Sequence, residues 1–451
     1  MATNAEWARR DLDVLWHPCT QMKDHEAWPP IPIRRASGVW LEDFDGHRYI
    51  DAISSWWVNL FGHGHPDINA ALKAQVEQLE HVLLAGFTHA PAIQLAEHLI
   101  AKAPHGLTRC FYSDNGSSAV EVALKMSYHA WRNQGRPEKT QFITLDNSYH
   151  GETLGALAVG DVPLYRETYA PLLMQAIRVR SPDAYYRTPG VTAEEHARWC
   201  FNDMEATLAR HAEKTAAVIV EPLVQCAGGM RMYDPVYLTL LREACDRHGV
   251  HLIADEIAVG FGRTGTLFAC EQGQVTPDFL CLSKGLTGGY LPLSATLTTS
   301  AIYDAFYADY AAGKAFLHSH SYTGNALACA VALASLRLFD RDDVLGSNLE
   351  KARLMRHAVA ELQDHPHVAE IRQTGMILAI EMAQDVASRK PYPPEQRRGL
   401  RVYREGLKRG VLLRPLGHVI YFMPPYVITP DEIEQMARAA IHGIHLATQA
   451  D

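Results

Sequence analysis

The sequence has few of the features that mark secreted, membrane or nucleic-acid-binding proteins. Its 451 residues carry 42 Lys and Arg against 51 Asp and Glu, a formal net charge of −9, and no basic cluster reverses that balance. A nucleic-acid groove would need such a cluster. No apolar run approaches the roughly 20 residues of a membrane helix, and residues 1–16 carry charges throughout, without the apolar core of a secretory signal. These absences predict a cytoplasmic protein with neither nucleic acid nor membrane as a partner.

Cysteine pairs and metal-ligand clusters are also missing. The eight cysteines are scattered without a Cys-x-x-Cys pair, so we expect small buried side chains or free thiols in a reducing compartment. His63-x-His65 and His318-x-His320 have no carboxylate partner at ligand spacing, so no metal site is predicted. The length of the chain favours two or more domains.

What the sequence does have is an acid and a lysine, each at the end of an apolar run within residues 250–293. His251-Leu252-Ile253-Ala254 predicts a buried strand that ends at Asp255, and Phe279-Leu280-Cys281-Leu282 predicts a second one, followed by Ser283 and Lys284. Ligands bind beyond the carboxyl ends of strands in open α/β sheets. A lysine can form a Schiff base with an aldehyde cofactor, and a carboxylate can keep the ring nitrogen of pyridoxal phosphate protonated. For the pair alone, a turn-capping Asp255 and a solvated Lys284 would be the commoner arrangement.

A second pattern predicts an anion site. Residues 109–121 are typical of a strand, a glycine turn and a helix, with Ser118 and Glu121 spaced as a capping box. The free N–H groups of the first helical turn would point at Asn115, Gly116 and Ser117, which suits a phosphate. An ordinary capped turn is the alternative.

Two further strand ends carry side chains suited to a site. Residues 142–145 and 217–220 predict buried strands, the first followed by Tyr149, which could stack on a flat ring, and the second by Glu221. Residues 260–265 match Gly-x-Gly-x-x-Gly, but residues 266–270 are not typical of a helix, so a dinucleotide site is rejected.

The two ends of the chain show other patterns. Residues 38–51 predict a hairpin, residues 66–82 a helix, and the strands expected over 368–372, 376–381 and 419–422 belong to a smaller unit.

The segment 250–293 resembles the signature of class III aminotransferases that depend on pyridoxal phosphate, and the chain as a whole resembles the adenosylmethionine-8-amino-7-oxononanoate (diaminopelargonic acid) aminotransferases of biotin synthesis. The narrower resemblance is carried by Trp16-His17-Pro18, Ser54-Ser55-Trp56-Trp57, Tyr149-His150-Gly151, Glu221-Pro222 with Ala227-Gly228-Gly229-Met230, and Leu413-Arg414-Pro415. It implies an α/β fold of type I: a large domain (66–338) with a mainly parallel seven-stranded sheet, and a small α+β domain built from both chain ends (1–65 and 339–451). It also implies a homodimer with sites at the interface.

The resemblance implies roles for cofactor-binding residues. Lys284 would attach the cofactor and carry the proton in catalysis, and Asp255 would face the ring nitrogen. Gly116 and Ser117 would hold the phosphate together with Ser321 of the partner chain.

The resemblance also implies a substrate site. Trp56 and Tyr149 would shape the pocket, with Tyr149 also covering one face of the cofactor. Arg414 would hold the substrate carboxylate, and Tyr421 and Arg263 would lie near the substrate, which also meets Lys284.

The implied reaction moves the amino group of S-adenosylmethionine to 8-amino-7-oxononanoate by a ping-pong route, giving 7,8-diaminononanoate. Cys19 departs from the family, since many members have Tyr after His-Pro, so the identity of the donor stays open. The alternative is a class III ω-aminotransferase for lysine, ornithine, β-alanine or 4-aminobutyrate. A non-catalytic cofactor-binding regulator would need an added DNA-binding domain, for which the first forty residues lack length and basic charge.

Overall fold

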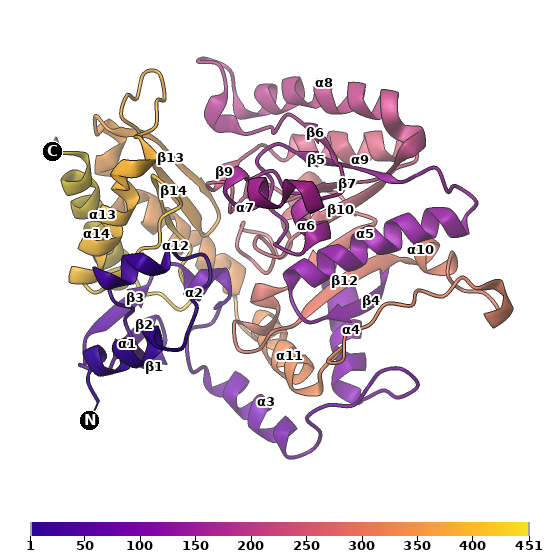
Figure 1. The fold of residues 1–451 in the computed structure, drawn as a ribbon, viewed down its shortest axis with the longest axis horizontal. Coiled ribbons are helices and arrows are strands. Elements are labelled where there is room, and N and C mark those ends of the chain that lie inside the picture. Colours follow the sequence, from indigo (N-terminus) through magenta and orange to yellow (C-terminus); the bar gives the residue numbers. More distant parts are fainter. Residues whose placement is uncertain (1, 450–451) are drawn as a thin grey trace.

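A seven-stranded, mostly parallel sheet forms the centre of the computed structural model, which describes residues 2–449 (Figure 1). The strand order is β4-β12-β11-β10-β7-β5-β6, and only β12 runs antiparallel to its neighbours. The strands are β4 (Leu107–Ser113), β5 (Gln141–Leu145), β6 (Ile177–Val179), β7 (Thr215–Val220), β10 (His251–Asp255), β11 (Phe279–Leu282) and β12 (Ser294–Thr299). The predicted seven-stranded α/β architecture is therefore confirmed.

Helices cover both faces of this sheet because its strands are apolar on both sides. Ile219, Ile253 and Phe279 pack in one core cluster with α5 (Gly116–Asn133). Their chain neighbours point to the opposite face, as the twofold alternation of a strand requires. There they join a second cluster with residues of α4 (Ala90–Lys102), α8 (Ala193–His211), α9 (Val236–His248) and α11 (Ala326–Arg341).

Both chain ends meet in one region, where the indigo and yellow segments lie side by side in Figure 1. The hairpin predicted over 38–51 is present as β2 (Trp40–Asp43) and β3 (Arg48–Asp51), flanked by β1 (Ile33–Ser37). β3 pairs with β15 (Val411–Leu412) near the other end of the chain. The domain bounds themselves stay a prediction.

A three-stranded antiparallel sheet comes after α11 in sequence. It consists of β13 (Val368–Thr374), β14 (Ile377–Met382) and β16 (Val419–Phe422), close to the strands expected there, and it is accompanied by α12 (Val344–Ala358), α13 (Arg398–Lys408) and α14 (Pro430–Thr448). A small two-stranded ribbon consists of β8 (Val224–Gln225) and β9 (Arg231–Met232), and β9 contacts β13 of this sheet.

The remaining helices are short, and one of them corrects the sequence-based expectation. They are α1 (Asn4–Leu12), α2 (Ser54–Trp57), α3 (Pro66–Val76), α6 (Leu154–Ala158), α7 (Pro163–Arg166) and α10 (Ser300–Asp304). The helix expected over 66–82 ends earlier, at Val76, and Gln75 and Leu79 form a hydrogen-bonded turn just beyond it. No helix among the described residues is long and apolar enough to cross a membrane.

Candidate active site

Lys284 and Asp255 lie at the carboxyl ends of two adjacent parallel strands. β10 pairs with β11 so that Asp255 is level with Cys281, three residues before the lysine. Both side chains line one cavity of about 370 Å³. Lys284 has a left-handed backbone (φ 44°), a strained conformation of the kind that collects at functional sites. The two groups that the sequence singled out are thus brought together.

The surroundings of Lys284 disfavour the charged form of its amine. Its Nζ lies 5.2 Å from the ring centre of Trp57 and has no hydrogen-bond partner among the residues that the structure describes. Burial lowers the pKa of Lys284, and the opposing effect of Asp255, Cys226 and Glu221 does not cancel it. A depressed pKa is what an amine needs to act as a nucleophile at neutral pH.

The Asp255 carboxylate is held rigidly. One oxygen accepts from the backbone N–H of Ile257 at 3.1 Å, and the other is 2.7 Å from Nδ1 of His150. Both side chains are buried, so this negative charge is oriented within the protein and kept from water. Nε2 of His150 is buried without a partner in the described chain.

The N-terminus of α5 lies on the same cavity, but its cap differs from the prediction. Asn115 is the N-cap, and its side chain accepts from the Ser118 N–H at 3.1 Å. The predicted capping box of Ser118 and Glu121 was wrong: the Glu121 carboxylate instead accepts from the backbone N–H of Gly155 at 2.8 Å. Asn is among the strongest N-cap residues, so the helix starts at Gly116.

Gly116 lets the chain pass close to the strand ends. A Cβ at this position would come within 2.9 Å of Ile257, so only glycine fits without displacement. Gly116 and Ser117 line the cavity at the first turn of a helix of 18 residues. Free N–H groups and the helix dipole make this turn suitable for a phosphate.

Two tryptophans form another wall of the cavity. Residues 54–57 all have positive φ values, a left-handed turn that the sequence did not predict. The turn lets Trp56 and Trp57 both line the cavity, although Trp57 is also buried in the core. The indole N–H of Trp57 donates to the Tyr421 hydroxyl at 3.0 Å. Tyr421 therefore lies behind the wall rather than on it.

Tyr149 and a carboxylate close the remaining side. The Tyr149 hydroxyl donates to Glu152 at 3.0 Å, and the Cys19 thiol lies 3.9 Å from the same carboxylate oxygen. Arg414 stacks on Trp56, with 3.9 Å between its guanidinium carbon and the ring centre. Glu152 thus lines the cavity, whereas Arg414 does not line it and contacts its wall through Trp56.

Four predicted site residues do not line the cavity: Arg414, Tyr421, Arg263 and Ser321. Arg263 is fully buried behind the cavity, where its guanidinium donates to the carbonyls of Pro424 at 2.8 Å and Asn59 at 3.0 Å. Ser321 is exposed and does not line the cavity of its own chain. The roles of these four residues stay predictions.

The sequence analysis gave no role of their own to three residues of the site. His150 belongs to the motif that was singled out for Tyr149, Glu152 follows that motif, and Asn115 was placed at the anion site without being recognised as the cap. Their signal was their position within a motif or directly beside it. A larger cavity, about 620 Å³, lies beside Asp146 and Trp199, but neither Lys284 nor Asp255 lines it, so we place the chemistry in the smaller one.

Comparison with known proteins agrees with this geometry. Residues 21–444 match the family described as Aminotransferase class-III. The chain is 48% identical over 434 residues to the adenosylmethionine-8-amino-7-oxononanoate aminotransferase of Helicobacter pylori, covering 95% of each chain. It is 45% identical over 451 residues to the enzyme of the same name from Geobacter sulfurreducens, covering 99% of this chain and 98% of the other.

Solved structures show the same likeness. The crystal structure of the adenosylmethionine-8-amino-7-oxononanoate aminotransferase of Methanocaldococcus jannaschii superposes with a TM-score of 0.92 at 37% identity, covering 98% of each chain. An omega transaminase from Pseudomonas jessenii in complex with PMP gives a TM-score of 0.93 at 28% identity, again over 98% of each chain.

Proposed function

Because the chain belongs to the class-III aminotransferase family, we propose that it transfers the amino group of S-adenosylmethionine to 8-amino-7-oxononanoate, giving 7,8-diaminononanoate. The protein is an aminotransferase that depends on pyridoxal phosphate. The observation that carries the proposal is the buried amine of Lys284 and the fixed carboxylate of Asp255 on one cavity, in a chain similar throughout to enzymes of that name.

The cavity residues fit pyridoxal phosphate. They offer a buried amine without a hydrogen-bond partner in the described chain, a carboxylate fixed from two sides, and a glycine-containing helix N-terminus. When bound, the cofactor supplies an electron-accepting ring that stabilises negative charge on the amine-bearing carbon. We assign its attachment and the proton transfer to Lys284, the ring nitrogen to Asp255, and the phosphate to Gly116 and Ser117.

The substrate side is assigned to the aromatic walls and Arg414. A guanidinium grips a carboxylate with two parallel hydrogen bonds, and its stacking on Trp56 keeps the fork of Arg414 oriented. Trp56 and Tyr149 enclose the substrate. Tyr421 and Arg263 support the pocket from behind, Tyr421 through Trp57 and Arg263 through backbone carbonyls of the adjoining segments.

We further propose a cytoplasmic homodimer. Ser321, which does not line the cavity of its own chain, would complete the phosphate site of the partner. Its loop carries exposed Leu317 and Tyr322, apolar surface that a second copy would cover.

The second candidate is an ω-aminotransferase with another donor or acceptor. The likeness to the omega transaminase from Pseudomonas jessenii extends over 98% of the chain, and Cys19 lines the pocket where many members of the biotin-synthesis group have Tyr. Lysine, ornithine, β-alanine and 4-aminobutyrate are the substrates to compare.

A two-step spectral titration tests the proposal. Adding S-adenosylmethionine to the purified protein loaded with pyridoxal phosphate should bleach the absorbance of the bound cofactor. Adding 8-amino-7-oxononanoate should then restore it, and Lys284→Ala should show neither change. Turnover of one of the four alternative amines without response to the biotin precursor would favour the second candidate, and no response to either proposed substrate would overturn the first.

A further inference from the structure

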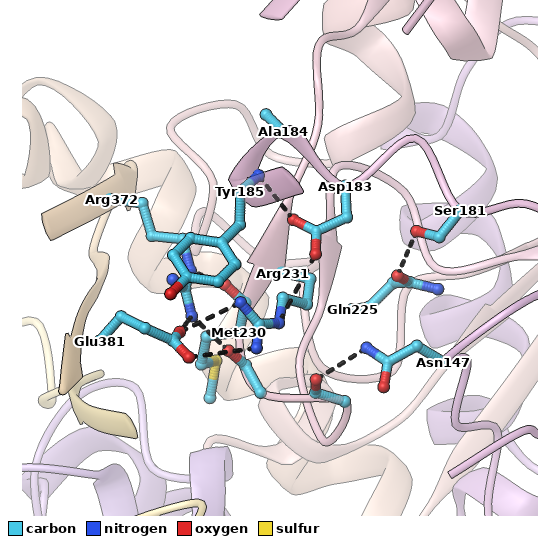
Figure 2. Close-up of polar contacts among 12 residues, drawn as sticks. Asn147, Ser181, Asp183, Ala184, Tyr185, Gln225, Met230, Arg231, Arg372 and Glu381 are labelled. Carbon is cyan, nitrogen blue, oxygen red and sulfur yellow. Dashed lines mark hydrogen bonds and ion pairs between the residues drawn. The ribbon is translucent and has the colours of Figure 1, made fainter. Parts of the chain in front are cut away.

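A buried cluster of charges joins the β8–β9 ribbon to the three-stranded sheet (Figure 2). Glu381 of β14 accepts from both terminal nitrogens of Arg231 at 3.1 and 3.2 Å, and it pairs with Arg372 of β13 at 2.7 Å. His418 donates to the same carboxylate at 2.8 Å. Glu381 is 1% exposed and Arg372 is 7% exposed, so the arrangement is shielded from water and geometrically fixed.

Arg372 also grips the turn that connects the two strands of the ribbon. Its Nε donates to the carbonyl of Met230 and its Nη2 to the carbonyl of Gly229, both at 2.6 Å. The turn depends on unusual backbone conformations, with φ of 101° at Gly229 and 53° at Met230. Such a turn needs outside contacts to hold its shape, and the guanidinium provides two.

The other side of the same turn is bound to the segment that carries Tyr149. The Asn147 side chain donates to the carbonyl of Gly228 at 2.7 Å, and a Cβ at Gly228 would come within 2.3 Å of that amide nitrogen. Glu221 accepts from the Tyr149 N–H at 2.9 Å with one oxygen and from the Cys226 N–H at 3.0 Å with the other. The turn and the Tyr149 segment are therefore one hydrogen-bonded unit.

We propose that Arg372, oriented by Glu381, is a positioning residue that sets the place of Tyr149 on the active-site wall through the 226–230 turn. Arg372 lies on a sheet outside the site and does not line the cavity. Its two donors fix the turn, and the turn fixes Tyr149 through Asn147 and Glu221. This role rests on the proposed function only in that Tyr149 lines the site.

Amide hydrogen exchange tests the proposal without any substrate. In Arg372→Met, loaded with pyridoxal phosphate, exchange in peptides covering residues 145–152 and 223–232 should rise about tenfold or more, because local opening becomes easier. Peptides from α14 should exchange as in the parent protein. Arg372→Lys, which keeps the charge and some donors, should restore most of the protection. Asn147→Ala should raise amide exchange in the 145–152 peptide in the same way. This second variant tests the proposal if Arg372→Met does not fold.

Arg187→Met is the matched control. Arg187 pairs with Glu370 of β13 at 3.1 Å near the same junction but makes no bond to the turn. The Arg187→Met variant should have a lower melting temperature but unchanged exchange at 145–152.

In steady-state assays, Arg372→Met should raise KM about tenfold with a smaller change in kcat, the sign of a misplaced pocket wall. Unchanged exchange at 145–152 in Arg372→Met and Asn147→Ala, or an equal rise in Arg187→Met, would overturn the proposal. Because exchange is measured without substrate, a wrong substrate assignment would leave this result intact.

Discussion

Asp255 shows how a single side chain is prepared for its role by its neighbours. One carboxylate oxygen accepts a hydrogen bond from a backbone N–H, and the other lies 2.7 Å from Nδ1 of His150. The carboxylate therefore has little freedom to rotate. A preorganised charge in a site closed to water stabilises developing opposite charge better than a solvated one.

A variant that removes this negative charge but keeps the shape of the side chain should show how much the charge contributes to catalysis. Asp255→Asn retains an oxygen for the Ile257 N–H but loses the negative charge, and we expect kcat/KM to fall about 10³-fold, the size typical of lost electrostatic stabilisation. Circular dichroism and the melting temperature verify the fold. Asp203→Asn, on a surface pair with Arg180, is the control and should keep full activity. A loss below tenfold in Asp255→Asn would contradict the assignment.

Asp255 and Lys284 could be located from the sequence because each follows a short apolar run that predicted a buried strand, and because the segment around them resembles the family signature. His150 could not, since its partner is 105 residues away in sequence and nothing local indicates the contact. The left-handed turn at residues 54–57 was equally out of reach, because Ser and Trp have no preference for positive φ.

Among the secondary-structure elements, α5 is the helix to which we assign the cofactor phosphate, and its start was misassigned from the sequence. Ser118 and Glu121 have the spacing of a capping box, but the spacing does not say which residue begins the helix. Asn115 comes first and caps it, while Glu121 is bonded to the backbone at the start of α6. Local pattern rules thus found the helix but chose the wrong cap, because the carboxylate of Glu121 bonds to a segment distant in sequence and not to the start of its own helix.

The cap of α5 should matter for both stability and cofactor affinity. Asn115→Ala should cost about 1 kcal/mol of unfolding free energy, the usual worth of an N-cap, and it should also weaken pyridoxal phosphate binding because the first turn frays. Thr429→Ala is the matched control: it removes the cap of α14, which does not line the cavity. Denaturant unfolding and cofactor titration should show similar stability losses but a changed cofactor Kd for Asn115→Ala alone. Equal cofactor affinities would contradict this role of the helix terminus.

The Glu381 cluster ties the two-stranded ribbon to the three-stranded sheet, and no sequence pattern indicated it. Arg231, Arg372 and Glu381 come from three strands of these two sheets, and each alone is an ordinary charged residue in a strand. Burial would raise the pKa of Glu381, but the hydrogen bond from His418 and the charges of Arg372 and Arg231 outweigh it and lower the pKa to about 2.

This depressed pKa predicts an acid-dependent loss of stability. Since the folded pKa lies below the unfolded value near 4.5, Glu381 contributes fully above pH 4.5 and loses its contribution as pH falls toward 2, by about 3 kcal/mol in total. Glu381→Gln should therefore be less stable by roughly that amount at pH 7. The difference from the parent should shrink steadily from pH 5 to pH 3 in urea unfolding. A difference that stays constant over this range would show that the ionised carboxylate is not its source.

The proposed dimer concerns the whole molecule, because Ser321 of one chain would have to bind the phosphate in the site of the other chain. Neither Lys284→Ala nor Ser321→Ala homodimers should have full activity: the first lacks the amine, and the second lacks a phosphate contact.

In a mixed dimer, the chain with Ser321→Ala keeps Lys284 and would receive Ser321 from its partner. One complete site would form per dimer, so isolated heterodimers should regain about half of the parental activity per dimer, as one of the two symmetry-related sites is restored. If Ser321 served its own chain, the only site with Lys284 would still lack the hydroxyl, and the heterodimer would have half the activity of the Ser321→Ala homodimer. Tagging the two chains differently and purifying the doubly tagged species separates these outcomes.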